Sequence, residues 1–236
     1  MKIELVLVDF DDTLVATAGR FRDARERLFS LLADQGLDAG DVARLHHDEI
    51  DPELRQRYGF GPHRLEEAFR ETYLRACARA GRNTDGALLD RCAALGRSVV
   101  GAPPPIDGAL AALARLTRSH PTVVYTQSGR MEYQIECVRA AGIVEIVGHE
   151  RVHVCAEKTT AAFVATIERF GVADPARAWM IGNSIRSDIN PALEAGANAI
   201  LVEVDEPWAF DVVEPVASGF TRVRSFAEAV DVMVGA

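Results

Sequence analysis

The sequence predicts an α/β protein in which a unit made only of helices is inserted into a doubly wound parallel sheet. From about residue 100 onward, short apolar runs typical of buried strands alternate with amphipathic helical segments. The intervening residues 17–99, which follow a first apolar run, show helical periodicity throughout. We therefore expect a sheet domain formed by residues 1–16 and 100–236, and a helical domain formed by residues 17–99.

The first expected element is a buried strand at residues 3–8, which is short, rich in branched apolar residues and followed by a polar turn. In the segment that follows, apolar side chains recur on single helical faces. The clearest faces are those of Phe21, Ala24, Leu28 and Leu31 and of Leu65, Phe69, Thr72 and Ala76. Further helices are expected within residues 41–57 and 84–99. Three consecutive prolines in residues 101–108 then end the helical pattern.

Strands and helices alternate after the prolines. The expected strands are TVVYT at 122–126, RVHVCA at 151–156, AWMIG at 178–182 and AILVEV at 199–204. The expected helices begin after an N-cap at Asp107, run through Ile135 and Val138 to Gly142, cover residues 160–170 and 188–195, and follow an N-cap at Ser225. This alternation is typical of a doubly wound parallel sheet, in which ligands bind beyond the carboxyl ends of the strands.

Polar residues follow the expected strands at that edge of the sheet. In chain order they are Asp9, Asp11 and Asp12, then Thr126–Gly129, then Glu157 and Lys158, then Gly182–Ser184 with Asp188 close behind. They supply carboxylates, hydroxyls, one lysine and small residues that expose backbone N–H groups. Such a set suits phosphoryl transfer, because the oxygens of a phosphate need positive charge and hydrogen-bond donors.

The two aspartates Asp9 and Asp11 have complementary chemical uses. Residues two apart in an extended chain point the same way, so both can face one substrate. Because two nearby carboxylates have their pKa values driven apart, one can stay ionised as a nucleophile. The other can hold a proton, give it to a leaving oxygen and later take one from water. The carboxylates also suit Mg²⁺, for which Asp9 and Asp188 are the natural pair.

The composition narrows the class of function. With 35 acidic and 26 basic residues the chain carries a net charge of −9, which argues against non-specific binding to nucleic acid. We expect no membrane span, because no run of 18 apolar residues occurs. The four cysteines are scattered and form no C-x-x-C pair, which indicates reduced thiols and a cytoplasmic protein.

The segment DFDDTL at residues 9–14 resembles the D-x-D-x-T signature of the haloacid dehalogenase-like (HAD) superfamily. Three later features resemble the other motifs of that superfamily in the right order: Thr126, Lys158 and the segment GNSIRSD at residues 182–188. The resemblance spans residues 3 to about 202. It implies a Rossmann-like catalytic core.

The resemblance also implies roles for the matching residues. Asp9 is expected to be the nucleophile that forms an aspartyl phosphate, and Asp11 the general acid and base. Thr126, Gln127 and Lys158 are expected to bind the phosphoryl group, with Lys158 also compensating the charge of Asp9. Thr13 is expected to stabilise the turn of the first loop, and Asp12 has no clear chemical role.

The resemblance implies Mg²⁺ as the cofactor, held by Asp9, the backbone carbonyl of Asp11, and Asp188. The sequence departs from the superfamily pattern at one ligand position, where Asn183 stands in place of the frequent aspartate. An amide offers an oxygen but no charge, so Asn183 is expected to be a second-tier ligand and Mg²⁺ affinity to be somewhat weaker.

The helical segment resembles the superfamily's first class of cap domain, which selects the leaving group. Within it, RQRYGFGPHR at residues 55–64 combines charged and aromatic side chains with glycines. This pattern predicts a specificity loop, although a polar connection between two helices explains it equally well. The candidate specificity residues are Arg57, Tyr58, His63 and Arg64.

The expected function is that of a Mg²⁺-dependent phosphatase acting on a small phosphorylated metabolite, as a monomer or homodimer. A phosphomutase would keep all four motifs and stays open as an alternative. A haloacid dehalogenase is disfavoured, because resemblance to those enzymes would predict an aromatic residue in place of Asp11 and no metal. A binding protein that kept the fold without catalysis is disfavoured by Asp9, Asp11 and Lys158, but not excluded.

Overall fold

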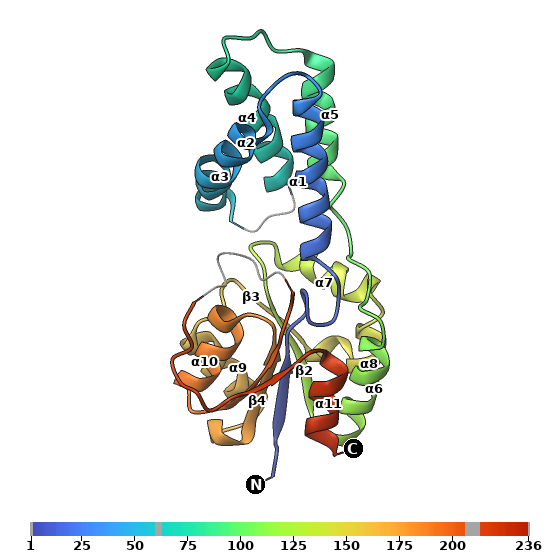
Figure 1. Ribbon diagram of the computed structural model, residues 1–236. Coiled ribbons are helices and arrows are strands. Elements are labelled where there is room, and N and C mark those ends of the chain that lie inside the picture. Colours follow the sequence, from blue (N-terminus) through green and yellow to red (C-terminus); the bar gives the residue numbers. More distant parts are fainter. Residues whose placement is uncertain (1, 60–62, 206–212, 236) are drawn as a thin grey trace. The chain divides into compact units, whose positions relative to one another are not determined.

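The computed structural model describes residues 2–59, 63–205 and 213–235 of the chain. It divides into two compact units: Met1–Ala18 with Ala102–Ala236, and Gly19–Gly101. The first unit is a sheet covered by helices and the second consists of helices, as Figure 1 shows. We call them the sheet unit and the helical unit. Within the described residues, no helix combines the length and apolar character needed to cross a membrane.

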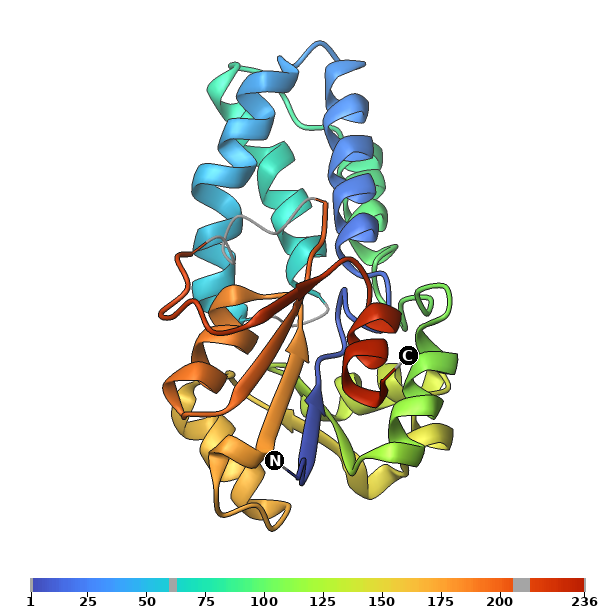
Figure 2. The same ribbon diagram turned by 60° about the horizontal axis from the view of Figure 1, so that its bottom comes forward.

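The sheet unit is built on six parallel strands, which confirms the predicted α/β class (Figure 2). Their order is β3-β2-β1-β4-β5-β6. The strands are β1 (Leu5–Val8), β2 (Thr122–Gln127), β3 (Val152–Cys155), β4 (Ala178–Gly182), β5 (Asn198–Val202) and β6 (Thr221–Val223). β1 therefore lies in the interior, paired with β2 on one side and β4 on the other. β2 and β3 follow on one side of β1, and β4, β5 and β6 follow on its other side. Doubly wound sheets bind ligands at the carboxyl ends of the strands where the strand order reverses in this way.

Helices cover both faces of the sheet. They are α6 (Ala109–Ser119), α7 (Met131–Ala140), α8 (Val144–Val147), α9 (Thr160–Arg169), α10 (Asn190–Glu194) and α11 (Phe226–Val234). Val6 and Val8 pack in one apolar cluster with residues of α6, α7 and α11, while Leu5 and Leu7 pack in another with residues of α9 and α10. Side chains alternate along a strand, so the fully apolar β1 is buried on both faces and fixed in position.

The helical unit has its own apolar core. Its elements are α1 (Ala18–Ala33), α2 (Ala39–Arg44), a π-helical turn η1 (Leu45–Ile50), α3 (Asp51–Tyr58), α4 (Arg64–Arg79) and α5 (Gly86–Arg97). α2, η1 and α3 form one continuous helical run, because the residues at both junctions keep right-handed helical dihedrals. Buried side chains that include Leu28, Leu32, Leu65, Phe69 and Cys92 form the core.

Two segments that link the sheet unit to the inserted residues run side by side. The amide of Ala16 donates to the carbonyl of Pro104 at 2.9 Å, and the amide of Ile106 donates to the carbonyl of Leu14 at 2.9 Å. Val15 and Pro105 form an antiparallel bridge between them. These bonds anchor the loop that follows β1, and with it the aspartates of that loop.

Several element boundaries differ from the sequence prediction. The predicted N-cap at Asp107 is wrong: the N-cap of α6 is Gly108, which adopts a left-handed conformation at φ 78°, a conformation that glycine adopts without steric cost. The predicted helix at 188–195 is present as α10 but begins as a π-helical turn, η4 (Ile185–Ile189), which was not predicted. The short strand β6 was not predicted. The predicted N-cap at Ser225 is confirmed, because its side chain accepts a hydrogen bond from the amide of Glu228.

Candidate active site

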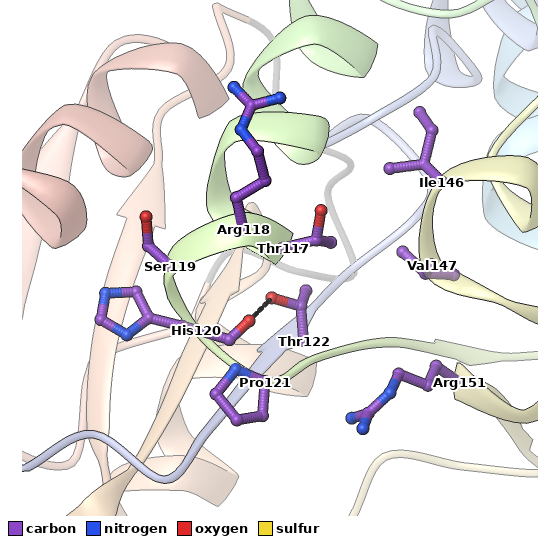
Figure 3. A pocket seen from close by; sticks show the side chains of 9 residues that line it. All are labelled: Thr117, Arg118, Ser119, His120, Pro121, Thr122, Ile146, Val147 and Arg151. Atoms are coloured by element: carbon purple, nitrogen blue, oxygen red, sulfur yellow. Dashed lines mark hydrogen bonds between the residues drawn. The ribbon is translucent and has the colours of Figure 1, made fainter.

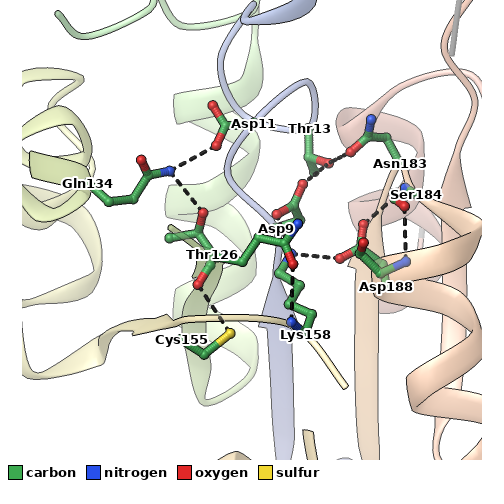
Figure 4. Close-up of polar contacts among 12 residues, drawn as sticks. Asp9, Asp11, Thr13, Thr126, Gln134, Cys155, Lys158, Asn183, Ser184 and Asp188 are labelled. Carbon is green, nitrogen blue, oxygen red and sulfur yellow. Dashed lines mark hydrogen bonds and ion pairs between the residues drawn. The ribbon is translucent and has the colours of Figure 1, made fainter. Parts of the chain in front are cut away.

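The loop after β1 carries three aspartates that have different surroundings; two of them, Asp9 and Asp11, are labelled in Figure 4. The amide of Asp9 donates to the carbonyl of Ile181 at 2.9 Å, which continues the pairing of β1 with β4 and fixes Asp9 at the carboxyl end of the strand. Phe10 is fully buried and anchors the loop in the apolar core. Asp9 is also buried, and the Thr13 hydroxyl donates to its Oδ2 at 3.2 Å. The loop thus holds one carboxylate firmly at the strand end.

Asp12 has a structural role. It is the only described non-glycine residue with a positive φ, at 57°, a conformation that aspartate and asparagine tolerate better than most residues. Its Oδ1 accepts hydrogen bonds from the amides of Thr17 at 2.9 Å and Ala18 at 2.8 Å. Asp12 therefore makes the turn of the loop and caps the start of α1, which accounts for the third acid of the motif.

Lys158 forms ion pairs with two aspartates, one that follows β1 and one that follows β4. Its buried Nζ donates to Oδ1 of Asp9 and, at 2.7 Å, to Oδ1 of Asp188. Burial opposes the charge of Lys158, but its two carboxylate partners outweigh burial and raise its pKa. Burial raises the pKa of Asp188 to about 7, with Lys158 acting against the shift and Asp9 adding to it. When both carboxylates are ionised, one cation between them leaves a net negative charge, which favours binding of a further cation.

Asp11 is held by both of its carboxylate oxygens. The Thr17 hydroxyl donates to Oδ1 at 2.6 Å, and Nε2 of Gln134 donates to Oδ2 at 2.8 Å. Burial and the charge of Asp9 raise the pKa of Asp11 to about 6, although both hydrogen bonds act against the shift. A carboxyl group with a pKa of about 6 can both give and accept a proton near neutral pH.

Gln134 links Asp11 to Thr126. The same Nε2 that donates to Asp11 also donates to Oγ1 of the buried Thr126 at 3.0 Å, as Figure 4 shows. The Thr126 oxygen thus acts as an acceptor here, which leaves its hydroxyl hydrogen for another acceptor such as a phosphate oxygen. Neither Gln134 nor Thr17 was predicted, since neither directly follows a strand or belongs to a motif.

Gln127, a predicted phosphate-binding residue, has a different contact from Thr126. Its Oε1 accepts a hydrogen bond from the amide of Lys158 at 3.1 Å. The side chain thus fixes the segment after β3, on which the lysine lies. Cys155, at the end of that strand, reaches back with its Sγ to the carbonyl of Thr126 at 3.6 Å. The ends of β2 and β3 are therefore tied together beside the aspartates.

The side-chain amide of Asn183 lies beside oxygen atoms of the loop that follows β1. The inward terminal atom of its amide is 3.0 Å from the carbonyl oxygen of Asp11 and 3.1 Å from Oδ2 of Asp9. With its nitrogen inward, the amide donates to both oxygens. With its oxygen inward, it accepts from the Thr13 hydroxyl at 3.3 Å and faces the other two oxygens.

This arrangement fits Mg²⁺. Oxygen ligands of octahedral Mg²⁺ lie at about 2.1 Å from the ion, which puts neighbouring ligands about 3 Å apart. The inward amide atom of Asn183 lies at such distances from the carbonyl oxygen of Asp11 and from Oδ2 of Asp9. The donors are a carboxylate, a carbonyl and an amide; within the described part of the chain, no three His, Cys, Asp or Glu side chains group in a way that could hold a metal.

The candidate specificity residues belong to the helical unit. Arg64 forms an ion pair with Asp51. Arg57 lies over the ring of Tyr58, with its guanidinium carbon 5.2 Å from the ring centroid, and the tyrosine is exposed. His63 precedes α4 and is exposed, without a side-chain capping bond. The remainder of the predicted loop, residues 60–62, lies outside the described residues.

The sheet unit also has a hollow near the start of β2 (Figure 3). It is lined by Thr117, Arg118, Ser119, His120, Pro121, Thr122, Ile146, Val147 and Arg151. This is the amino end of the strand, whereas Asp9 and Thr126 lie at or beside the carboxyl ends of β1 and β2. The hollow holds no carboxylate that could pair with a metal or act as an acid. It therefore offers a weaker basis for catalysis than the strand ends.

Comparison with known proteins agrees with this geometry. The family model described as haloacid dehalogenase-like hydrolase matches residues 3–196, which include every residue of the site described above. The search of curated proteins finds no significant match.

Solved structures share the fold over nearly the whole chain. A haloacid dehalogenase-like family hydrolase from Xanthomonas campestris is 22% identical, with a TM-score of 0.77 over 99% of this chain and 94% of that one. The HAD hydrolase YfnB from Bacillus subtilis, described as bound to magnesium, is 19% identical, with a TM-score of 0.61 and full coverage of both chains.

A third similar structure carries a different activity in its name. The 2-haloacid dehalogenase of Pseudomonas syringae pv. Tomato is 23% identical, with a TM-score of 0.57 over 98% of each chain. At these identities the likeness shows the fold alone, so it does not choose between dehalogenation and phosphate ester hydrolysis. Taken with the family model, which matches most of the sequence, these findings establish that the chain belongs to the haloacid dehalogenase-like hydrolases.

Proposed function

We propose that this hydrolase is a Mg²⁺-dependent phosphatase that hydrolyses a small phosphorylated metabolite through an aspartyl phosphate on Asp9. The observation that carries the proposal is the placement of Asp11. Its carboxyl group lies beside the buried Asp9, is held by Thr17 and Gln134, and has a pKa raised to about 6. A nucleophilic carboxylate paired with a proton-donating carboxyl group suits an ester whose leaving oxygen must be protonated.

The reaction follows from these positions. The carboxylate of Asp9 attacks phosphorus, and the ester oxygen leaves with the proton of Asp11. Asp11 then takes a proton from a water molecule that attacks the phosphorus of the aspartyl phosphate, which frees Asp9 and releases phosphate. Lys158 and the hydroxyl hydrogen of Thr126 bind oxygens of the phosphoryl group, whose negative charge they stabilise.

Magnesium would be held by Asp9, the backbone carbonyl of Asp11, Asp188 and, with its oxygen turned inward, Asn183. When bound, Mg²⁺ supplies positive charge that offsets the charge of the phosphoryl group. The net negative charge of Asp9, Lys158 and Asp188 supports this assignment. The magnesium described for the Bacillus subtilis structure is consistent with it.

The helical unit is proposed as the cap that selects the leaving group, with Arg57, Tyr58, His63 and Arg64 as candidate specificity residues. We propose a small metabolite rather than nucleic acid as the substrate, because a net charge of −9 disfavours non-specific binding to nucleic acid. We propose a cytoplasmic monomer or homodimer without membrane attachment.

A haloacid dehalogenase is the second candidate, because structures bearing that name share the fold. In such a reaction the carboxylate of Asp9 would displace a halide, which leaves without a proton. Asp11 would then have no function in the displacement, and its position beside Asp9 would add unfavourable charge repulsion. The chemistry of Asp11 therefore favours the phosphatase.

Turnover of p-nitrophenyl phosphate in Mg²⁺ and in EDTA tests the proposal. We expect turnover with Mg²⁺ that EDTA abolishes, and loss of turnover in Asp9→Asn. The matched control is Asp12→Asn, which keeps an acceptor for the amides of Thr17 and Ala18 and tolerates the positive φ, so turnover should change little. Release of chloride from 2-chloropropionate without any phosphatase activity would overturn the proposal, and so would equal losses in both variants.

A further inference from the structure

A cluster of charged and imidazole groups in the helical unit takes no part in the chemical steps described above, although one member, Arg64, is also a candidate specificity residue. It brings together four elements: Arg25 from α1, His46 and His47 from η1, Asp51 from the start of α3, and Arg64 from the start of α4. We call these five residues the arginine cluster. The π-helical turn that carries the histidines is a rare geometry, often found at functional sites.

The helix geometry places Arg25 at this cluster. Phe29 lies one turn further along α1, on the same face. Its ring contacts the rings of His46 and His47, with centroids 5.7 Å and 5.6 Å apart. Arg25 interacts electrostatically with both Asp51 and Arg64. The guanidinium groups of Arg25 and Arg64 therefore lie near one carboxylate.

The charges of the cluster are not balanced. Asp51 forms its ion pair with Arg64, and the two side chains are only 19% and 10% exposed. Arg25 is partly buried and has no hydrogen bond or ion pair with any residue in the described ranges. Burial is the largest influence and lowers the pKa of Arg25; the charges of Asp51 and Glu26 oppose this shift, and those of Arg64 and Arg22 add to it. A partly buried cation without a bonded counter-charge is costly, and an anionic ligand would remove that cost.

The histidines do not supply the missing negative charge, and they add no positive charge. The Thr72 hydroxyl donates to the carbonyl of Ala68 at 2.7 Å, so at 2.9 Å it accepts from Nδ1 of His46. Nδ1 therefore carries the proton of the neutral ring. Nε2 of His46 is left as a fully buried acceptor without a partner among the described residues. The cluster thus contains both a cation without a bonded partner among the described residues and an unsatisfied polar atom.

We infer that the arginine cluster is a binding site for a small anion, a phosphate or carboxylate group, held by Arg25 and Arg64. A guanidinium group matches both ligand types through paired N–H donors. The site is separate from the residues that bind the transferring phosphoryl group, all of which lie in the sheet unit. It does not depend on the proposed phosphatase activity.

Arginine-detected NMR of the full chain tests the inference at the residue itself. Titration with inorganic phosphate, and separately with malonate, is expected to shift the Nε–Hε signal of Arg25 saturably, and comparison of the two distinguishes a phosphate site from a carboxylate site. The Arg25→Lys variant assigns the signal and keeps the charge. Arg27, an exposed arginine of the same helix, serves as the internal control and should not shift.

Calorimetry with the better of the two anions gives the affinity. Because a hydrogen bond to a charged group contributes about 1.5–3 kcal/mol, Arg25→Met should weaken this binding by about tenfold or more, while Arg27→Met should leave it unchanged. Circular dichroism confirms that each variant is folded. A linear, unsaturable shift of Arg25, or equal shifts of Arg25 and Arg27, would overturn the inference.

Discussion

The buried lysine of the site has to satisfy two carboxylates at once. Lys158 pairs with Asp9 and Asp188 in an environment with little water, where an unpaired charge would be costly. The arrangement also restricts Asp9, because one of its oxygens is bound to the lysine while the other faces Thr13 and Asn183. A nucleophile held at both oxygens loses little freedom when substrate binds, which favours reaction.

Substitution of Gln134 should affect the position of the Asp11 carboxyl group more than it affects substrate binding. In Gln134→Met the donor shared by Asp11 and Thr126 is removed while the side-chain length is kept. A hydrogen bond to a charged group contributes about 1.5–3 kcal/mol, so kcat for p-nitrophenyl phosphate should fall by about 10- to 100-fold. KM should change less, because Lys158, the residue proposed to bind the phosphoryl group, is unchanged. Steady-state kinetics with saturating Mg²⁺ measures both.

The isosteric variant Gln134→Glu sharpens the same test. It keeps the shape of the side chain but replaces the donor by a carboxylate oxygen that faces Asp11. Its kcat at neutral pH should fall at least as far as that of Gln134→Met, because repulsion is added to the lost bond. Full activity in Gln134→Glu would show that the hydrogen bond to Asp11 does not position the acid.

The sequence predicted the residues at strand ends better than those that support them. Asp9, Thr126 and Lys158 follow apolar strands, so the topology of a parallel sheet predicts that they meet. Gln134 comes from the second turn of α7 and Thr17 precedes α1, where glutamine and threonine are ordinary residues. Their contacts depend on the angle of a helix and the path of a loop, which no local pattern specifies.

At the scale of elements, the packing of α4 against α5 depends on a glycine that apolar periodicity does not predict. α4 and α5 both carry apolar faces, and those faces predict that the helices pack. The distance between them depends on one residue, Gly96 in the last turn of α5. A Cβ atom at Gly96 would lie 2.5 Å from Cα of Glu66 and 2.7 Å from the carbonyl oxygen of Leu65. The two backbones therefore meet at this glycine.

Gly96→Ala should destabilise the protein although alanine is the better helix former. The steric conflict is with backbone, so the helices must separate, at a cost of about 1–3 kcal/mol, which exceeds the gain in helix propensity of about 1 kcal/mol. The matched control is Gly86→Ala in the first turn of the same helix, where a Cβ would meet nothing within 4 Å.

Thermal unfolding of the two alanine variants measures the difference. The Tm of Gly96→Ala should fall, and that of Gly86→Ala should stay the same or rise slightly, because alanine restricts the unfolded chain. A rise in Tm for both variants would mean that α4 and α5 separate at no cost.

At the scale of the whole molecule, the alternation of strands and helices was sufficient to predict the parallel sheet, and the family match agrees with it. Element boundaries were less predictable. β6 has three residues, two of them exposed, and therefore lacks the apolar run that identified the other strands. The π-helical turns η1 and η4 were not predicted: η1 lies within a predicted helix, and η4 overlaps the start of another.

The two units have separate cores, and one contains a buried histidine that should make it sensitive to acid. His46 is fully buried, and burial lowers its pKa from 6.5 to about 3. Between these values the unfolded chain binds a proton that the folded unit does not. Stability from the neutral ring is therefore complete above pH 6.5 and is lost as the pH falls toward 3, by about 1.4 kcal/mol per pH unit.

We therefore expect the helical unit to unfold before the sheet unit under mild acid. Hydrogen exchange at pH 7 and pH 4.5, corrected for intrinsic rates, should show protection lost first in α4 and η1 and retained in β1 and β4. In His46→Gln the difference in protection between pH 7 and pH 4.5 should become smaller, because glutamine does not titrate. His63→Gln, a change at an exposed histidine of the same unit, should leave it intact. Equal loss of protection in both units, or an unchanged pH effect in His46→Gln, would show that other groups control the acid response.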